Sequence, residues 1–152
     1  MDANNKIGEQ TIISANNKIS LLMDSRSQNE SLARTLVAAF IAPLDPSIDV
    51  MMDIKTAISE AVTNAVIHGY GDKEGQIKID LAIEDTELKI IVSDTGVGIA
   101  DIEKAMEPLY TSLPEMERAG MGFMVMESFM DSVKVKSSPG KGTAVEMVKK
   151  IL

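Results

Sequence analysis

The sequence contains no cysteine, which excludes disulfide bonds and thiolate metal sites. It also lacks tryptophan, and aromatic residues make up only 3% of the chain, so aliphatic and methionine side chains must fill most of the core. Four of the methionines lie in one late stretch: Met121, Met124, Met126 and Met130. Such a cluster is typical of core filling, although an adaptable binding surface would also use it.

Basic residues are scarce as well, and the 15 Lys and Arg against 23 Asp and Glu give a net charge of −8. This balance argues against a protein that binds a nucleic-acid backbone, because no dense basic patch is present. Any anionic ligand would need a metal ion and locally placed donors. Long apolar runs are missing too, so neither a signal peptide nor a membrane span is expected, and the predicted location is cytoplasmic.

The length of 152 residues predicts one folded domain at 18–152, preceded by a flexible extension at 1–17. Apolar periodicity predicts an α+β fold, a two-layer sandwich with helices on one face of a mostly antiparallel mixed sheet. Between the predicted hairpin at 76–94 and the last predicted helix lies a long connection, 95–120, of a kind that is usually functional or mobile. The expected elements are a strand at 19–25, a helix ended by Pro43, a helix at about 47–68, a hairpin at 76–94, a helix at 121–131 and a hairpin at 132–150.

The second predicted helix carries two polar side chains, Glu60 and Asn64, beside its apolar stripe. They project about 40° apart, on the flank of the stripe. A carboxylate at the rim of a core is unfavourable unless it is paired or meets a ligand. From this helix alone, two hydrogen-bonded polar residues without a further role are the simpler interpretation.

A second motif begins at Asp94, which ends an apolar strand and is followed by Gly96 and Gly98. A carboxylate at this place would accept a hydrogen bond from an exocyclic amine, and the glycines would admit a planar ring. A tight turn capped by Asp explains the same residues without a ligand.

Two further glycine motifs come late in the chain. Gly120 and Gly122 open a predicted helix, whose free N–H groups suit an anion, and Arg118 lies close by in sequence. The string "GKGTA" at 140–144 adds a glycine turn with the hydroxyl of Thr143. Each motif by itself is weak evidence for a binding site, since a flexible helix start or a simple turn would have the same residues.

In this order, however, E-x-x-x-N, D-x-G-x-G, a long loop, G-x-G and a late G-T resemble the N, G1, G2 and G3 boxes of the GHKL ATPase/kinase superfamily, over about residues 18–150. Within it, "SQNESLAR", "LDPSID", "SEAVTNAVIHGY" and "PLYTSLPEMERAGMGFMVMESFMD" resemble the anti-sigma serine kinases of endospore formation. The resemblance implies a GHKL (Bergerat-type) ATP-binding fold, protein serine kinase activity, and ATP or ADP with Mg²⁺ as cofactors.

The resemblance also implies a role for each motif residue. Glu60 would be catalytic, Asn64 would bind Mg²⁺ and Asp94 would bind the adenine amino group. Residues 106–119 would form a lid over the phosphates, and the ATP and ADP forms would differ in affinity for the sigma factor. The other implied nucleotide-binding residues are Gly96, Gly98, Thr111, Ser112, Arg118, Gly120, Met121, Gly122 and Thr143.

The partners implied by the resemblance are sigma factor F, an anti-anti-sigma protein that is phosphorylated on serine, and a second copy of the chain in a homodimer. Arg34 would dock both protein partners, whereas from spacing alone it is a solvated charge. His68, the lone histidine, is disfavoured as a phosphoacceptor because the chain has no dimerising helical hairpin. No nucleic acid or membrane is expected to bind directly.

Three alternatives remain. A general-stress anti-sigma kinase of the same family would share all four motifs. A sequestering module without catalysis would bind nucleotide and transfer nothing. A detached ATPase domain of a histidine kinase or gyrase-like protein fits less well, since no transducer domain or phosphoacceptor segment is recognisable.

Overall fold

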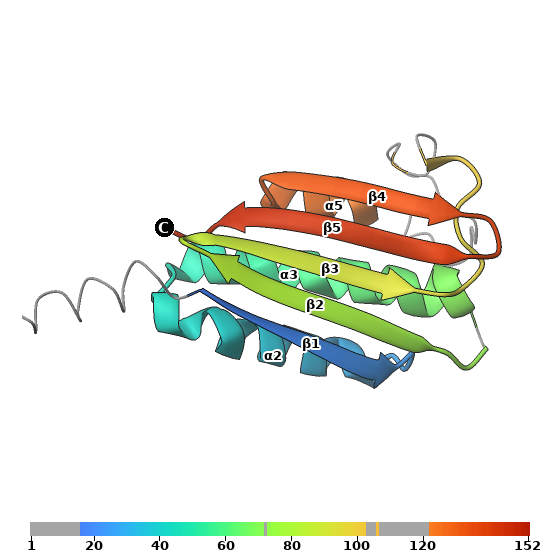
Figure 1. Ribbon diagram of the computed structural model, residues 1–152, viewed down its shortest axis with the longest axis horizontal. Helices are drawn as coiled ribbons and strands as arrows, with labels where there is room; N and C mark the ends of the chain where they lie inside the picture. Colours follow the sequence, from blue (N-terminus) through green and yellow to red (C-terminus); the bar gives the residue numbers. More distant parts are fainter. Residues whose placement is uncertain (1–15, 72, 103–105, 107–121) are drawn as a thin grey trace, which may run out of the picture.

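The computed structural model describes residues 16–71, 73–102, 106 and 122–152, which form two layers (Figure 1). A five-stranded sheet in the order β1-β2-β3-β5-β4 is covered on one face by the helices α2, α3 and α5. The elements are β1 (Asn17–Asp24), α2 (Gln28–Ile41), η1 (Ala42–Leu44), α3 (Ile48–Asn64), η2 (Ala65–Tyr70), β2 (Gln76–Glu84), β3 (Glu87–Asp94), α5 (Gly122–Phe129), β4 (Ser132–Ser138) and β5 (Gly142–Lys150).

All pairings between the described strands are antiparallel. The hairpin of β2 and β3 turns at Asp85 and Thr86, as predicted, and Asp85 takes a positive φ of 56°. Strand β5 then pairs with β3, which leaves β1 and β4 as the two edges. The predicted two-layer α+β sandwich is therefore confirmed.

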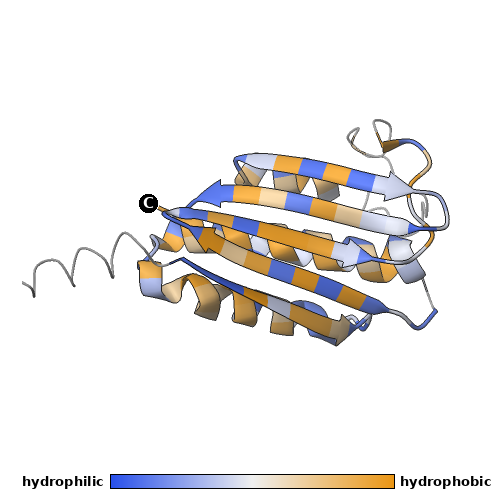
Figure 2. Ribbon diagram, in the orientation of Figure 1, coloured by the Kyte–Doolittle hydropathy of each residue, from blue (hydrophilic) through white to orange (hydrophobic). Residues whose placement is uncertain are grey.

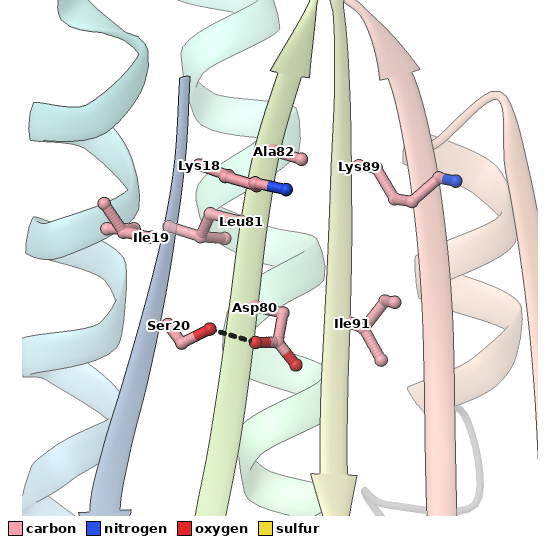
Figure 3. A pocket seen from close by; sticks show the side chains of 8 residues that line it. All are labelled: Lys18, Ile19, Ser20, Asp80, Leu81, Ala82, Lys89 and Ile91. Carbon is pink, nitrogen blue, oxygen red and sulfur yellow. Dashed lines mark hydrogen bonds between the residues drawn. The ribbon is translucent and has the colours of Figure 1, made fainter. Parts of the chain in front are cut away.

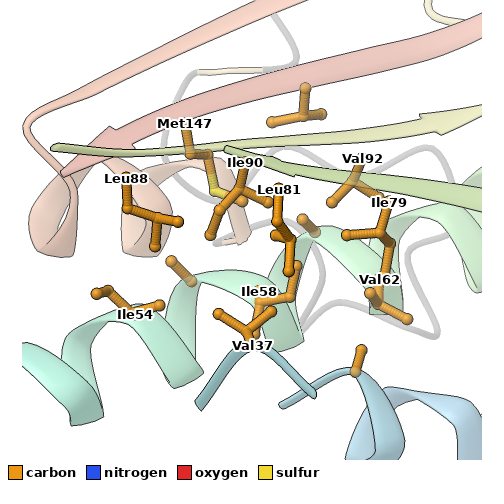
Figure 4. Packing of buried hydrophobic residues seen from close by; sticks show 14 of the residues in the cluster. Val37, Ile54, Ile58, Val62, Ile79, Leu81, Leu88, Ile90, Val92 and Met147 are labelled. Atoms are coloured by element: carbon orange, nitrogen blue, oxygen red, sulfur yellow. The ribbon is translucent and has the colours of Figure 1, made fainter. Parts of the chain in front are cut away.

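Residues that alternate along the strands build the core between the layers (Figure 2). On β2 the buried residues are every second one, and the polar residues between them face away from the helices. Leu81, Ile90 and Met147 meet Val37 and Ile58 from the helical layer (Figure 4). Each fully buried side chain of this kind contributes about 1.5–3 kcal/mol to stability. Alternation with a period of two thus decides which face of the sheet the helices cover.

Two members of the late methionine cluster belong to this core, whereas Met124 is only partly buried. Met126 is fully buried and Met130 nearly so. Core filling is therefore confirmed for these two residues, and Met121 lies outside the described part of the chain.

Helix α3 lies between α2 and α5 and against the sheet (Figure 1). Every residue from 57 to 62 is consequently buried, including Glu60, whose exposed fraction is only 5%. Glu60 thus lies on the predicted flank of the apolar stripe, and in this part of α3 the flank is buried as well.

Local signals set most helix boundaries. The Ser47 hydroxyl accepts a hydrogen bond from the Val50 N–H at 3.2 Å and caps α3. Pro43 falls in the 3₁₀ turn that follows α2. Beyond Asn64 the chain continues as a wider π-helical turn to Tyr70, two residues past the predicted end. Such π turns are frequent at functional sites. No helix in the described ranges is long and apolar enough to cross a membrane.

Candidate functional site

Several motif residues meet at one end of the sheet, where β3 ends and β5 begins. Asp94 is the last residue of β3 and lies opposite Thr143 of β5 in the antiparallel register. The π turn η2 contacts both strands there. The motif that begins at Asp94 and the glycine turn at 140–144 are thus neighbours in space, although about fifty residues separate them in sequence.

The Asp94 carboxylate lies directly on Gly69 of η2. A Cβ atom added to Gly69 would stand 3.0 Å from both Cγ and Oδ1 of Asp94. Oδ1 accepts a hydrogen bond from the Gly96 N–H at 2.9 Å. Burial raises the pKa of Asp94 above its ordinary range, while backbone N–H groups of Gly96 and Thr143 oppose this shift. A half-buried acceptor of this kind suits a ligand that presents a polar N–H group.

The glycines after Asp94 are required by the protein's own backbone. A Cβ on Gly96 would stand 2.0 Å from the Gly69 carbonyl oxygen. Gly98 has a φ of +75°, and a Cβ there would stand 2.1 Å from the Ser138 carbonyl oxygen. Other residues would therefore push the turn away from η2 and from the end of β4.

Asn64, at the other end of the site, packs against the start of α5. A Cβ on Gly122 would lie 2.8 Å from Asn64 Nδ2, so the glycine lets α5 approach the amide. Both Nδ2 and Oδ1 are buried, and neither has a hydrogen-bond partner among the described residues. Glu60 precedes Asn64 by one helical turn and shares its face of α3. Buried polar atoms in this condition are places where a water molecule, an ion or a ligand can bind.

Asn64 also fits a magnesium ion in its chemistry. Mg²⁺ takes oxygen ligands and usually combines one or two protein groups with substrate phosphates and water. The Asn64 amide supplies one such oxygen, and the described residues include no group of three or more His, Asp or Glu that would hold a metal alone. If Mg²⁺ were bound at this amide oxygen, substrate phosphates and water would supply its other ligands.

His68 follows Asn64 by one turn, within η2. Burial lowers the pKa of His68 below its ordinary value, so the imidazole is neutral at pH 7. A neutral ring at this place fits a structural role at the edge of the site.

Three residues near the site are not identified by sequence reasoning. Gly69 and Tyr70 directly follow the end of the predicted helix at 47–68, where an irregular segment is expected. The string "HGYG" after Asn64 is the sequence signal that could have identified them. Ser137 gives no signal, since it is one polar residue of an alternating strand. Its hydroxyl donates to the Gly142 carbonyl at 2.8 Å and accepts from the Ile99 N–H at 2.7 Å.

Thr143 completes this arrangement through its hydroxyl, which lies 2.8 Å from the Ser137 hydroxyl. The remaining predicted nucleotide-binding residues lie outside the described part of the chain. They are Thr111, Ser112, Arg118, Gly120 and Met121.

Arg34 is located on α2 rather than among these residues. Its side chain is 41% exposed, and Nε stands 3.6 Å from Glu30 Oε1. The same Glu30 oxygen accepts a hydrogen bond from the Ser59 hydroxyl of α3. The guanidinium is thus held at the surface of the helical layer.

A shallow hollow of about 270 Å³ lies elsewhere, on the sheet face opposite the helices (Figure 3). Its lining includes Lys18, Asp80 and Lys89, and the Ser20 hydroxyl donates to Asp80 there. None of the predicted site residues lines it. The predicted site residues are instead found in two other contacts, Asn64 against Gly122 and Asp94 against Gly69.

Comparison with known proteins gives a consistent result. Residues 24–149 match the family model of the histidine kinase-like ATPase domain. Relatives named anti-sigma F factor are 58% identical over 134 residues in Clostridium acetobutylicum and 56% identical over 137 residues in Pasteuria penetrans. These alignments cover 88% and 89% of this chain, and 94% and 91% of the relatives.

Solved structures agree on the fold. The RsbU and RsbW domains of a Mycobacterium tuberculosis protein align with a TM-score of 0.65 at 20% identity, covering 89% of this chain and 32% of that one. The catalytic domain of the histidine kinase ThkA aligns with a TM-score of 0.55 at 17% identity, covering 86% and 96%. At these identities the likeness concerns the fold alone.

Proposed function

Because the chain belongs to the anti-sigma F factor family and carries a histidine kinase-like ATPase domain, we propose that it holds sigma factor F inactive and phosphorylates a serine of an anti-anti-sigma protein. The observation that carries the proposed kinase activity is the buried amide of Asn64. This amide packs on Gly122, and Asn64 itself lies one helical turn after Glu60 on α3. Both activities would take place in the cytoplasm, where sigma factors act.

In the proposed reaction, the serine oxygen forms a bond to the γ-phosphorus of ATP, and the bond from that phosphorus to the ADP oxygen breaks. Glu60 would orient the hydroxyl and take its proton. Asn64 would hold Mg²⁺, which when bound neutralises charge on the phosphates. Asp94 would accept a hydrogen bond from the adenine amino group, beside Thr143.

The proposed catalytic residues and the proposed adenine acceptor are supported by connected elements, which would position them relative to one another. Glu60 and Asn64 share α3, which continues without interruption into η2 and Gly69 beneath Asp94. A rigid support of this kind keeps the base, the metal ligand and the adenine acceptor in a fixed relation.

Arg34 is proposed to dock both protein partners. Its ion pair with Glu30 is partly exposed and therefore contributes little to stability, so a partner carboxylate can compete for it at low cost. We also propose a homodimer. Leu22 on the edge strand β1, with an exposed fraction of 64%, supports a contact there, and a solution mass twice that of one chain would test it.

A single experiment with two variants tests the function. The chain is incubated with labelled ATP, Mg²⁺ and the anti-anti-sigma protein, and phosphoserine and sigma factor F binding are measured. Glu60→Ala should lower phosphoserine formation by about 10²-fold or more while sigma factor binding persists. Arg34→Ala should weaken binding of both partners while nucleotide binding persists.

The alternatives give other outcomes. A non-catalytic sequestering protein would bind the sigma factor and form no phosphoserine even as wild type. A stress-response kinase would phosphorylate a stress antagonist in preference to the sporulation one. Full activity of Glu60→Ala would overturn the catalytic role of that residue.

A further inference from the structure

The turn that follows Asp94 is fixed by three consecutive N–H groups, those of residues 95–97. The first donates to the Tyr70 hydroxyl at 2.8 Å, and the third donates to the Gly69 carbonyl at 2.9 Å. The middle one donates to the Asp94 carboxylate itself at 2.9 Å. Gly69 and Tyr70 of η2 thus each accept one N–H hydrogen bond from the turn. Gly69 accepts through its backbone carbonyl, and Tyr70 accepts through its side chain.

The Tyr70 hydroxyl is itself held in place. It donates to the Gln76 carbonyl at 2.5 Å and lies 3.2 Å from the Thr95 hydroxyl. Its ring packs against Gly75, where an added Cβ would stand 2.3 Å from the ring atom Cε1. A phenol hydroxyl has one proton to donate, and Gln76 takes it, so the hydroxyl faces the Thr95 N–H as an acceptor.

We infer that Tyr70 is a positioning residue for the Asp94 carboxylate and thereby sets the preference of the site for a base that carries an amino group. This inference rests on the proposed function, in which Asp94 accepts a hydrogen bond from adenine. Without the hydroxyl, the Thr95 N–H loses its acceptor, and the turn that orients Asp94 loses one of the two backbone N–H hydrogen bonds that it donates to η2. Directional recognition of a ligand is sensitive to shifts of this kind.

The experiment compares ATP with inosine triphosphate, which carries a carbonyl oxygen in place of the adenine amino group. Equilibrium titrations in Mg²⁺ use the full chain and the variant Tyr70→Phe. We expect the ratio of ATP to inosine triphosphate affinity to fall by about threefold to tenfold, the value of one neutral hydrogen bond. In the kinase assay the KM for ATP should rise while kcat at saturating ATP is retained, because Glu60 and Asn64 are untouched.

Matched variants separate positioning from general damage. Thr95→Ala removes the neighbouring hydroxyl but keeps the N–H bond to Tyr70, and should retain the wild-type ratio. Gly75→Ala keeps the Tyr70 hydroxyl but displaces its ring, and should lower the ratio even if Tyr70→Phe folds poorly. In an Asp94→Asn background, Tyr70→Phe should cause no further loss of preference, since it acts through Asp94.

The outcomes distinguish the inference from the function beneath it. A wild-type ratio in both Tyr70→Phe and Gly75→Ala would overturn the role of Tyr70 and leave the proposed function standing. A wild-type chain that binds both nucleotides equally would overturn the adenine role of Asp94, and the inference with it. An equal loss for both nucleotides in Tyr70→Phe would also contradict the inference, since it indicates a general structural effect.

Discussion

At the residue scale, the site consists of polar groups that a stable core would avoid. Asn64 has a buried amide that lacks a described partner, and Asp94 has a carboxylate whose pKa is raised by burial. Each desolvated group lowers the stability of the folded state. Sites of this kind trade stability for function, so substitutions in them are expected to change the two in opposite directions.

Asp94→Asn is the residue-scale prediction. A raised pKa means that the folded state binds the proton more tightly than the unfolded state does. The contribution of Asp94 to stability is therefore fullest below its ordinary pKa of 3.8 and is lost as pH rises through the raised value. At pH 7 the variant should unfold at a higher urea concentration than wild type. The difference between the two unfolding midpoints should shrink as the pH falls toward 4.

The same variant should bind ATP about tenfold to a hundredfold more weakly, the usual value of a hydrogen bond to a charged group. Urea titrations from pH 4 to pH 7 and equilibrium ATP binding measure the two effects. A variant less stable than wild type at pH 7, with a gap that grows with pH, would contradict the expected direction of the stability change.

At the element scale, glycines allow strands and turns to approach one another at the site. Gly142 begins β5 with a φ of +91°, and a Cβ there would stand 2.0 Å from the Asp94 carbonyl oxygen. Gly140, two residues earlier in the same turn, has a φ of +76° but no atom within 4 Å of an added Cβ. A side chain at Gly140 would therefore cause backbone strain alone, whereas one at Gly142 would cause both backbone strain and a steric clash.

Alanine substitutions at these two positions form a matched pair. Gly140→Ala should destabilise by about 1–2 kcal/mol, the strain of a left-handed backbone for a residue with a Cβ. Gly142→Ala adds a clash with β3 and should destabilise by more than about 3 kcal/mol, and it should weaken ATP binding through Asp94. Urea unfolding of both variants tests this, and equal losses would show that the contact at Asp94 is unimportant.

At the scale of the whole molecule, the proposed site joins both layers, so ligand binding there would be coupled to folding. Asn64 and Gly69 come from the helical layer, whereas Asp94 and Thr143 come from the sheet. A ligand that contacts both layers stabilises the complete fold rather than one element. The net charge of −8 opposes binding of a free nucleoside triphosphate and favours one whose charge is partly neutralised.

Mg-ATP at a hundred times its Kd should therefore stabilise the chain by about 2.7 kcal/mol. For a chain of this size, that corresponds to a Tm increase of about 5–10 °C. A chelator of Mg²⁺ should remove most of the increase when ATP is present and should leave Tm unchanged when ATP is absent. Thermal unfolding under these four conditions measures it. A Tm that is insensitive to the chelator in the presence of ATP would contradict the proposed role of Asn64.

Much of the fold could be predicted from local sequence patterns. Alternation at 76–94 predicted the β2–β3 hairpin with its turn at Asp85, and Ser47 and Pro43 marked helix ends where the structure has them. The depth at which Glu60 is buried could not be predicted, because it depends on α2 and α5 packing on both sides of α3, which the helical periodicity of α3 does not contain.

The sequence by itself determined the element types, the buried face of each strand and the order of the four motifs, because each depends on residues close together in the chain. Only the tertiary structure decided that Asn64 meets Gly122, that Asp94 rests on Gly69, and that Tyr70 holds the turn beside it. Those contacts join residues that lie 25 to 58 positions apart. They exist because the helical layer and the sheet bury a shared apolar surface, and the packing of that surface sets which polar groups meet at its end.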